Sequence, residues 1–281
     1  MTFEITPYSR YDREAVLRLQ QSSTHIHNHL DWRAPHEWLD DTASQVRLAR
    51  AGGHIVGNML VSAPYNGASW LRMVAVADTH NVSLMLDALW IQMRLALADC
   101  ATRKVGMLTT RSWIANYLPA LGFHVSNQVI TFERNGPYLP TPLRADLTIR
   151  AVKPEDLEAV RAVDGTAFAA MWQYGSRDLH DAYRIAAHFT VAEMNRRIVG
   201  YQISTVSHEG GHLVRLATAP RLQGMGVGSM LLGETIEYFL KHGQEHMTVN
   251  TQSDNFSSQQ LYRRFGFEQV GKSVPVWMVT L

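Results

Sequence analysis

The chain repeats one pattern of residues at a spacing of about half its length of 281 residues. The starts of the two copies match, because Phe3-Glu4-Ile5 followed by Asp12-x-Glu14 corresponds to Leu147-Thr148-Ile149 followed by Asp156-x-Glu158. Further on, Ile55-Val56-Gly57 recurs as Ile198-Val199-Gly200, and Gly122-Phe123 recurs as Gly266-Phe267. Ordered similarity of this extent predicts two tandem copies of one fold rather than a single large domain.

A proline-rich stretch from Gly136 to Pro142 separates the copies and has the composition of a semi-rigid linker. We therefore expect domains over residues 1–135 and 144–281, joined by a linker over 136–143. Patterning in the second copy predicts strands at 147–152, 188–194, 197–207, 211–218, 246–252 and 268–280, and helices at 154–168, 226–242 and 256–264. The segment between the first helix and the second strand is expected to be irregular. Each copy is then a mixed sheet flanked by helices, of the α/β or α+β class.

The composition describes a globular protein with a sizeable core, at 46% hydrophobic and 18% charged residues. A formal net charge of +1 gives no indication of a nucleic-acid or membrane partner. The first residues lack the pattern of a signal peptide, and no apolar run is long enough to span a membrane. Cys100 is the single cysteine, so it cannot form an intrachain disulfide, and its apolar helix predicts a packing role. These features favour a cytoplasmic protein.

A glycine-rich turn joins a strand to a helix in the second copy. The apolar strand Leu213–Thr218 is stopped by Pro220, and Gly224, Gly226 and Gly228 precede a helical pattern that begins at Val227. Such a turn leaves backbone N–H groups unpaired at the positive end of the helix dipole, where anions and above all phosphates bind. The spacing is not that of a Rossmann loop, and no lysine follows as in a Walker loop.

Arg221-x-x-Gly224-x-Gly226 resembles the pyrophosphate loop of the GNAT superfamily of acyl-CoA-dependent N-acyltransferases. Asn255-x-x-Ser258-x-x-Leu261-Tyr262-x-x-Phe265-Gly266-Phe267 resembles the second cofactor-side motif of that family, at the expected distance. The resemblance implies acetyl-CoA as cosubstrate, no metal, and a sheet whose fourth and fifth strands splay apart to admit the cofactor. It also implies that the backbone of Leu216, Ala217 and Thr218 pairs with the pantetheine arm and the acetyl carbonyl. The pyrophosphate would lie against Arg221 and the backbone N–H groups of Gln223, Gly224, Met225, Gly226, Val227, Gly228 and Ser229.

Two residues of the second motif carry expected roles in transfer. Tyr262 is the candidate general acid, because a phenol of pKa about 10 can protonate a departing thiolate whose thiol has a pKa of about 8.5. A core tyrosine packed against Phe265 and Phe267 is the alternative. Asn255 would orient the pantetheine arm, cap the following helix, or both.

The general base is left open by the sequence. Several members of the family that this chain resembles carry a glutamate on the strand before the tyrosine motif, at the position of Asn250 here. Asparagine cannot accept the proton, although it could hold a water or the acceptor. A bound water is an equal alternative to any side chain. The remaining candidates are His212, which strand alternation would place on the face of Leu216, together with Glu193, Asp178, His180 and Asp181.

The first copy departs from the cofactor motifs. Val82 and Leu84 align with Gly224 and Gly226, and Leu118 aligns with Tyr262, so we expect a degenerate copy that retains the fold and loses the cofactor loop. Its segment from His25 to Trp38 contains four histidines, which could bind a metal only with further ligands. We expect this segment to form a loop or a wall of the acceptor pocket rather than a metal site. The matching segment of the second copy, Phe168–Gly175, is aromatic and typical of a core, with a wall of the acceptor pocket as the alternative. The four histidines are His25, His27, His29 and His36.

The favoured function is acetyl transfer from acetyl-CoA to a primary amine of an unidentified acceptor, by a monomer or homodimer. A narrower alternative is the tandem enzyme type that acetylates the amine of a sugar-derived thiol, mycothiol synthase. A non-catalytic acyl-CoA-binding regulatory module is suggested by Asn250, although the intact tyrosine motif argues against it. An assembly scaffold would not need the glycine loop.

Overall fold

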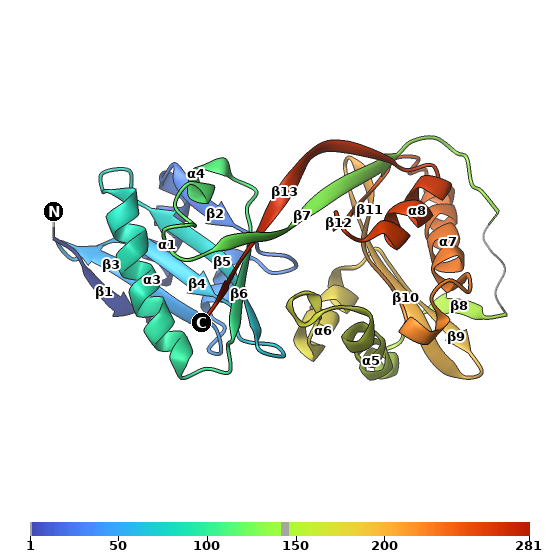
Figure 1. The fold of residues 1–281 in the computed structure, drawn as a ribbon, viewed down its shortest axis with the longest axis horizontal. Coiled ribbons are helices and arrows are strands. Elements are labelled where there is room, and N and C mark those ends of the chain that lie inside the picture. Colours follow the sequence, from blue (N-terminus) through green and yellow to red (C-terminus); the bar gives the residue numbers. More distant parts are fainter. Residues whose placement is uncertain (1, 142–145) are drawn as a thin grey trace. The chain divides into compact units, whose positions relative to one another are not determined.

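The computed structural model describes residues 2–141 and 146–281, so positions 142–143 of the predicted linker lie outside the described residues. The chain forms two compact units, one of residues 1–127 and 274–281 and one of residues 128–273. Both are mixed, mostly antiparallel sheets with helices (Figure 1), which confirms the predicted fold class. Among the described residues, no helix is long and apolar enough to cross a membrane.

The two units have the same strand order. The first runs β1 (Glu4–Pro7), β3 (Gln45–Ala51), β4 (His54–Val61), β5 (Ala68–Val76), β6 (Lys104–Leu108) and the end of β13 (Glu268–Thr280). The second runs β8 (Thr148–Ala151), β9 (His188–Met194), β10 (Arg197–Ser207), β11 (Gly210–Thr218), β12 (Met247–Gln252) and the end of β7 (His124–Arg134). In each unit the fourth and fifth strands pair in parallel, β5 with β6 and β11 with β12.

The sixth strand of each sheet is supplied by the other half of the sequence. Residues 129–134 of β7 pair antiparallel with β12 in the second unit. Residues 276–280 of β13 pair antiparallel with β6 in the first unit. The units therefore differ from the predicted ranges 1–135 and 144–281 in these two segments, because both long strands continue from one unit into the other (Figure 1).

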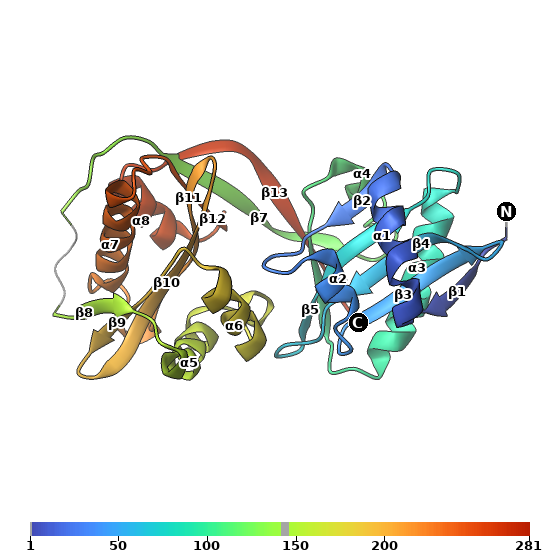
Figure 2. The same ribbon diagram turned by 180° about the vertical axis from the view of Figure 1, so that it is seen from behind.

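Helices cover both faces of each sheet because each sheet is apolar on both sides. In the first unit α1 (Arg13–Ser22) packs on a core around Leu48, Leu60 and Met73, and α3 (Val82–Ala98) packs on a separate core on the opposite face. Figure 1 shows α3 in front of the sheet, and Figure 2 shows α1 in front of it. The shorter elements of this unit are β2 (His25–Asn28), α2 (Pro35–Leu39) and α4 (Ser112–Ala115).

The strands predicted for the second copy are all present to within one residue at each end, the last of them being β13. The helices are α5 (Leu157–Ala167), α6 (Ser176–Ile185), α7 (Val227–Lys241) and α8 (Phe256–Arg264). Helix α6 corrects the prediction of an irregular segment. It begins after Gly175, whose N–H donates to the Asp178 carboxylate over 2.9 Å, and it buries Leu179 and Ala182. Its apolar and charged residues lie on opposite faces of the helix, so the sequence contained a helical periodicity that the prediction missed.

Helix α7 sits close to β10 because Gly200 leaves room for it. A Cβ atom at Gly200 would lie 2.8 Å from the Ala217 carbonyl oxygen and 2.9 Å from a methyl carbon of Val227. Both neighbours are held in place, one in the β11 backbone and the other in the first turn of α7, so neither can move away cheaply.

We predict that Gly200→Ala destabilises the protein by about 1–3 kcal/mol, the usual cost of overpacking. Gly165→Ala in α5 is the matched control, because a Cβ atom there meets nothing within 4 Å. It should leave stability unchanged or raise it by about 0.5–1 kcal/mol through helix propensity. Urea unfolding of both variants measures the difference, and equal stabilities would show that the contact of α7 with β10 tolerates a methyl group.

Candidate functional site

A gap opens between β11 and β12 in the second unit. The two strands pair only from Gly211 to Leu213 and from Met247 to Val249. Against β10, one additional residue of β11 lies between Leu213 and Arg215, which is a β-bulge. A bulge bends its strand, so β11 diverges from β12 after this point. The β12-facing edge of residues 214–218 has no strand partner within the described chain, and such an edge can pair with an extended ligand.

Arg215, at the bulge, is buried and points to the α5 face of the sheet. Its guanidinium donates to the Asp164 carboxylate of α5 over 2.6 Å and to the Tyr201 hydroxyl over 2.9 Å. The Tyr201 hydroxyl also donates to Asp164, whose side chain is completely buried. Loss of water disfavours a charged arginine, but these partners more than compensate and raise the pKa of Arg215. The charged pair therefore links α5, β10 and β11 at the point where the gap begins.

The segment between α5 and α6 is fixed by the same arginine. The Phe168 and Tyr174 rings lie on its guanidinium, each with a centroid 3.8 Å away, and Arg215 donates to the Trp172 carbonyl oxygen over 2.6 Å. The segment Phe168–Gly175 is thus held against β11 by cation–π contacts and a hydrogen bond. Sequence reasoning missed this cluster, although an arginine within an apolar strand and an aspartate on the apolar face of α5 were visible signals.

The glycine loop leads into an uncapped helix. Gly224 and Gly226 have φ values of 77° and 90°, which residues with a Cβ atom rarely adopt. Gly226 is the N-cap of α7 and provides no side-chain hydrogen bond, so the first N–H groups of this helix stay available. Gln223 and Met225 are exposed beside them, while Val227 and Ser229 are buried. The arrangement fits the predicted anion site.

Tyr262 lies on α8 with only 4% of its surface exposed. Its ring packs against Phe132 and Phe267, with centroids 6.0 Å and 5.9 Å away. Burial raises the pKa of Tyr262 to about 12, so the phenol is protonated at neutral pH. Asn255 caps α8, since its side-chain oxygen accepts from the Ser258 N–H over 3.2 Å. Tyr262 therefore packs in the core and also retains a proton that it could donate.

A polar strip runs across β11, β12 and β7 on the sheet face opposite the α7 core. The His212 Nδ1 lies 2.7 Å from the Thr248 hydroxyl, and the Asn250 side-chain oxygen accepts from the Thr131 hydroxyl over 2.9 Å. Burial lowers the pKa of His212, so its ring is neutral at pH 7. The prediction that His212 shares a face with Leu216 is wrong. Because of the bulge, Leu213 and Leu216 pack on the same core, and His212 projects to the other side.

The other candidate bases are engaged elsewhere. Glu193 accepts from Arg150 over 2.9 Å, Asp178 caps α6, and Asp181 forms an ion pair with Arg184 at 3.2 Å. His180 is exposed on α6. Among the predicted candidates, His212 and Asn250 are the two that border the diverging strands.

In the first unit the corresponding gap is filled by the chain itself. Strands β5 and β6 pair only from Ala68 to Trp70, and β2 pairs antiparallel with residues 73–76 of β5 along the same edge. Helix α3 is also capped, since the Asn81 side chain accepts from the Leu84 N–H over 3.0 Å. The strand edge and the helix start, which would receive a cofactor in the second unit, are thus both occupied by protein groups in the first.

The histidine-rich segment corrects the prediction of a loop in part, because it forms β2 and the start of α2 on either side of an irregular stretch over residues 29–34. His25 and His27 lie on β2, and His27 is completely buried, which lowers its pKa to about 3. Trp38 is 3% exposed in the core beneath α1, and its indole donates to the Leu30 carbonyl oxygen. It is a core residue of its own unit rather than part of a pocket wall. No cluster of three metal-ligating side chains occurs among the described residues.

We predict that Asp164→Asn destabilises the second unit by about 3–5 kcal/mol, because it leaves the buried Arg215 charge unpaired. Glu158→Gln, an exposed carboxylate on the same helix paired with Arg161, is the control and should produce no measurable change. Thermal unfolding of both variants provides the comparison. Equal melting temperatures would mean that Arg215 is compensated by its aromatic and carbonyl partners alone.

Residues 157–267 match the sequence profile of the acetyltransferase (GNAT) family. A mycothiol acetyltransferase of Acidimicrobium ferrooxidans is 28% identical over 266 residues, covering 83% of this chain and 83% of that relative. An uncharacterized N-acetyltransferase of Methanocaldococcus jannaschii is 27% identical over 124 residues, covering 43% of this chain and 78% of the relative. A tandem GNAT protein from the clavulanic acid biosynthesis pathway has the same fold, with a TM-score of 0.64 at 14% identity, covering 99% of this chain and 98% of that one.

Proposed function

We propose that this chain, an acyltransferase whose residues 157–267 match the GNAT family, acetylates a primary amine by direct attack on acetyl-CoA. The observation that carries the proposal is the unpaired edge of β11 beside the uncapped start of α7. One offers backbone groups to an extended amide-containing arm, and the other offers N–H groups to a phosphate.

The cofactor roles follow from these two features. The backbone of Leu216, Ala217 and Thr218 pairs with the pantetheine arm and polarises the thioester carbonyl, since fixed N–H donors stabilise the negative charge that develops there. Residues 223–229 hold the pyrophosphate through main-chain N–H groups, and Arg221 adds positive charge beside it. Asn255 fixes the start of α8, which keeps Tyr262 in place.

The proton transfers are assigned to Tyr262 and His212. As the amine nitrogen bonds to the carbonyl carbon, the carbon–sulfur bond breaks and the Tyr262 hydroxyl gives its proton to the departing thiolate. The excess proton of the amine passes to the neutral His212 ring, either directly or through a water held by Asn250. At the end of the cycle His212 releases its proton to solvent and Tyr262 takes one up from solvent, which restores both groups. Asn250 itself can orient a group but cannot accept the proton.

One narrower class of acceptor is favoured over other primary amines. Similarity to a mycothiol acetyltransferase extends over 83% of both chains, which favours the amine of a sugar-derived thiol. Measuring thiol release from acetyl-CoA with a panel of amino sugars, amino-sugar thiols, peptides and simple amines tests this. Tight binding of acetyl-CoA without turnover on any of them would instead support the regulatory module.

We predict one acetyl-CoA per chain by calorimetry, because β2 and Asn81 close the corresponding places in the first unit. Gly226→Val should abolish binding, since valine disfavours a φ of 90° and crowds the helix start. Asn81→Gly, at the start of α3 in the first unit, is the matched control and should leave binding unchanged. Two equivalent sites per chain would contradict the assignment to the second unit alone.

Tyr262 and His212 should define opposite ends of the pH profile. With a pKa of about 12, Tyr262 is protonated below that value, so kcat should stay level on the alkaline side up to about pH 11. His212 has a lowered pKa and accepts a proton only above it, so kcat should fall only below the ordinary histidine range near pH 6.5.

Tyr262→Phe should lower kcat by about 100-fold with little change in acetyl-CoA affinity. His212→Asn should remove the acid limb.

The control for these variants is Tyr238→Phe, whose hydroxyl donates to the Ala187 carbonyl oxygen on the α7 side of the sheet. Its kcat should match that of the unmodified protein. If Tyr262→Phe behaves like this control with a reactive amine, Tyr262 has a packing role only.

A further inference from the structure

Helix α3 of the first unit exposes an apolar stripe, which consists of Leu84, Ala88, Ile91 and Leu95. The three larger members are 62%, 59% and 61% exposed, and Ala88 is half-buried between them. The opposite side of the helix is buried against its own sheet through Met85, Leu86, Leu89, Trp90, Met93 and Leu97. The helix is therefore apolar on both sides, and a helix of this kind is ordinarily covered on both sides.

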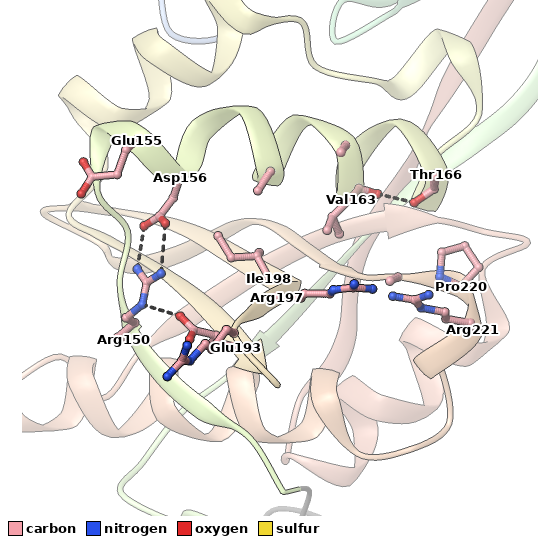
Figure 3. A pocket seen from close by; sticks show the side chains of 14 residues that line it. Arg150, Glu155, Asp156, Val163, Thr166, Glu193, Arg197, Ile198, Pro220 and Arg221 are labelled. Atoms are coloured by element: carbon pink, nitrogen blue, oxygen red, sulfur yellow. Dashed lines mark hydrogen bonds and ion pairs between the residues drawn. The ribbon is translucent and has the colours of Figure 1, made fainter.

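The corresponding helix of the second unit, α7, has a charged outer side. Its exposed residues Glu237 and Lys241 form an ion pair at 2.6 Å. Charges are also paired within the chain at the pocket between α5 and β10, where Arg150 donates to Asp156 over 2.6 Å and to Glu193 over 2.9 Å (Figure 3). The fold that the two units share therefore does not require an apolar outer side at this helix.

The apolar stripe has the spacing of a helix–helix contact. Its members follow one another in steps of four, three and four residues, which is the pattern of the apolar positions in a coiled coil. The steps are the same in both chain directions. An antiparallel second copy of α3 would therefore bring Leu84 against Leu95 and Ala88 against Ile91, so that a small side chain faces a large one and the two stripes interdigitate.

Two charged residues beside the stripe favour the same arrangement. Asp87 and Arg94 flank it on one side, and neither forms an ion pair with a described residue of its own chain. In the antiparallel pair, Asp87 of each copy lies beside Arg94 of the other, so the twofold symmetry produces this contact twice. In a parallel pair, Asp87 would lie opposite the uncharged Gln92. Charge complementarity therefore favours an antiparallel second copy of the same helix.

We propose that two copies of this chain associate through the apolar stripe of α3 as a symmetric dimer with antiparallel helices. Each copy uses the same residues for the contact, so the assembly closes at two chains. One pair of helices buries less surface than a standard interface of about 1,600 Å², so the dimer is weak and dissociates on dilution. The contact involves no residue assigned to acetyl-CoA.

Sedimentation velocity of the full chain at low salt tests the dimer. The unmodified chain should be dimeric at about 100 µM and monomeric at about 1 µM, the range of a weak interface. Ile91→Glu buries a carboxylate at the centre of the stripe and should weaken association about 100-fold. Val206→Glu is the matched control, because it makes a similar change at a valine of β10 that is 52% exposed, and it should have no effect.

Charge reversal tests the antiparallel direction. Asp87→Arg and Arg94→Asp, each alone, bring like charges together at two places and should weaken association about tenfold. The double variant combines both changes and restores opposite charges, so its dissociation constant should return to that of the unmodified chain. A double variant that associates no better than the single variants contradicts the antiparallel pair. A chain that is monomeric at about 100 µM overturns the dimer and leaves the stripe to a different partner.

Discussion

The buried contact between Arg215 and Asp164 is the constraint on which the second unit depends. A charged pair without access to water is costly unless its remaining donors are satisfied, and here a phenol, a backbone carbonyl and two aromatic faces satisfy them. These partners come from α5, β10 and the segment before α6. The same residue lies at the bulge where β11 leaves β12, so one side chain both orders the segment beside the gap and anchors the strand that borders it.

The two units share one fold but differ in what occupies two corresponding places in it. Each sheet has the same strand order and the same short parallel pairing that ends early. In the first unit, β2 occupies the edge of β5 and Asn81 occupies the start of α3. In the second, no residue that the structure describes takes either place. The two units therefore differ in proposed function because protein groups occupy the strand edge and the helix start in the first unit and leave them open to a ligand in the second. The fold around these two places is the same.

The sequence predicted the sheet well because its strands are apolar, short and separated by turn residues, as at Asn195-Arg196. It predicted the glycine loop because positive φ angles require particular residues. It did not predict the bulge, since one additional residue in a strand leaves no compositional mark, and the face of His212 was therefore misassigned. It also missed the pairing of Asp164 with Arg215, which joins residues 51 positions apart. Similarly, the sequence did not predict β2, because it lies in the segment after the first helix that was expected to be irregular. The pairing of β2 with β5 joins residues far apart in the chain.

The exchange of β7 and β13 has a consequence for biosynthesis. The strand that completes the first sheet, residues 276–280, is translated after the whole of the second unit. Until then the outer edge of β6 lacks its partner, and an unpaired edge is a site for association with other nascent chains. The second unit has no such delay, because its sixth strand in β7 is made before the rest of it. During synthesis from the N-terminus, the second sheet should thus be completed before the first, although the first sheet begins earlier in the chain.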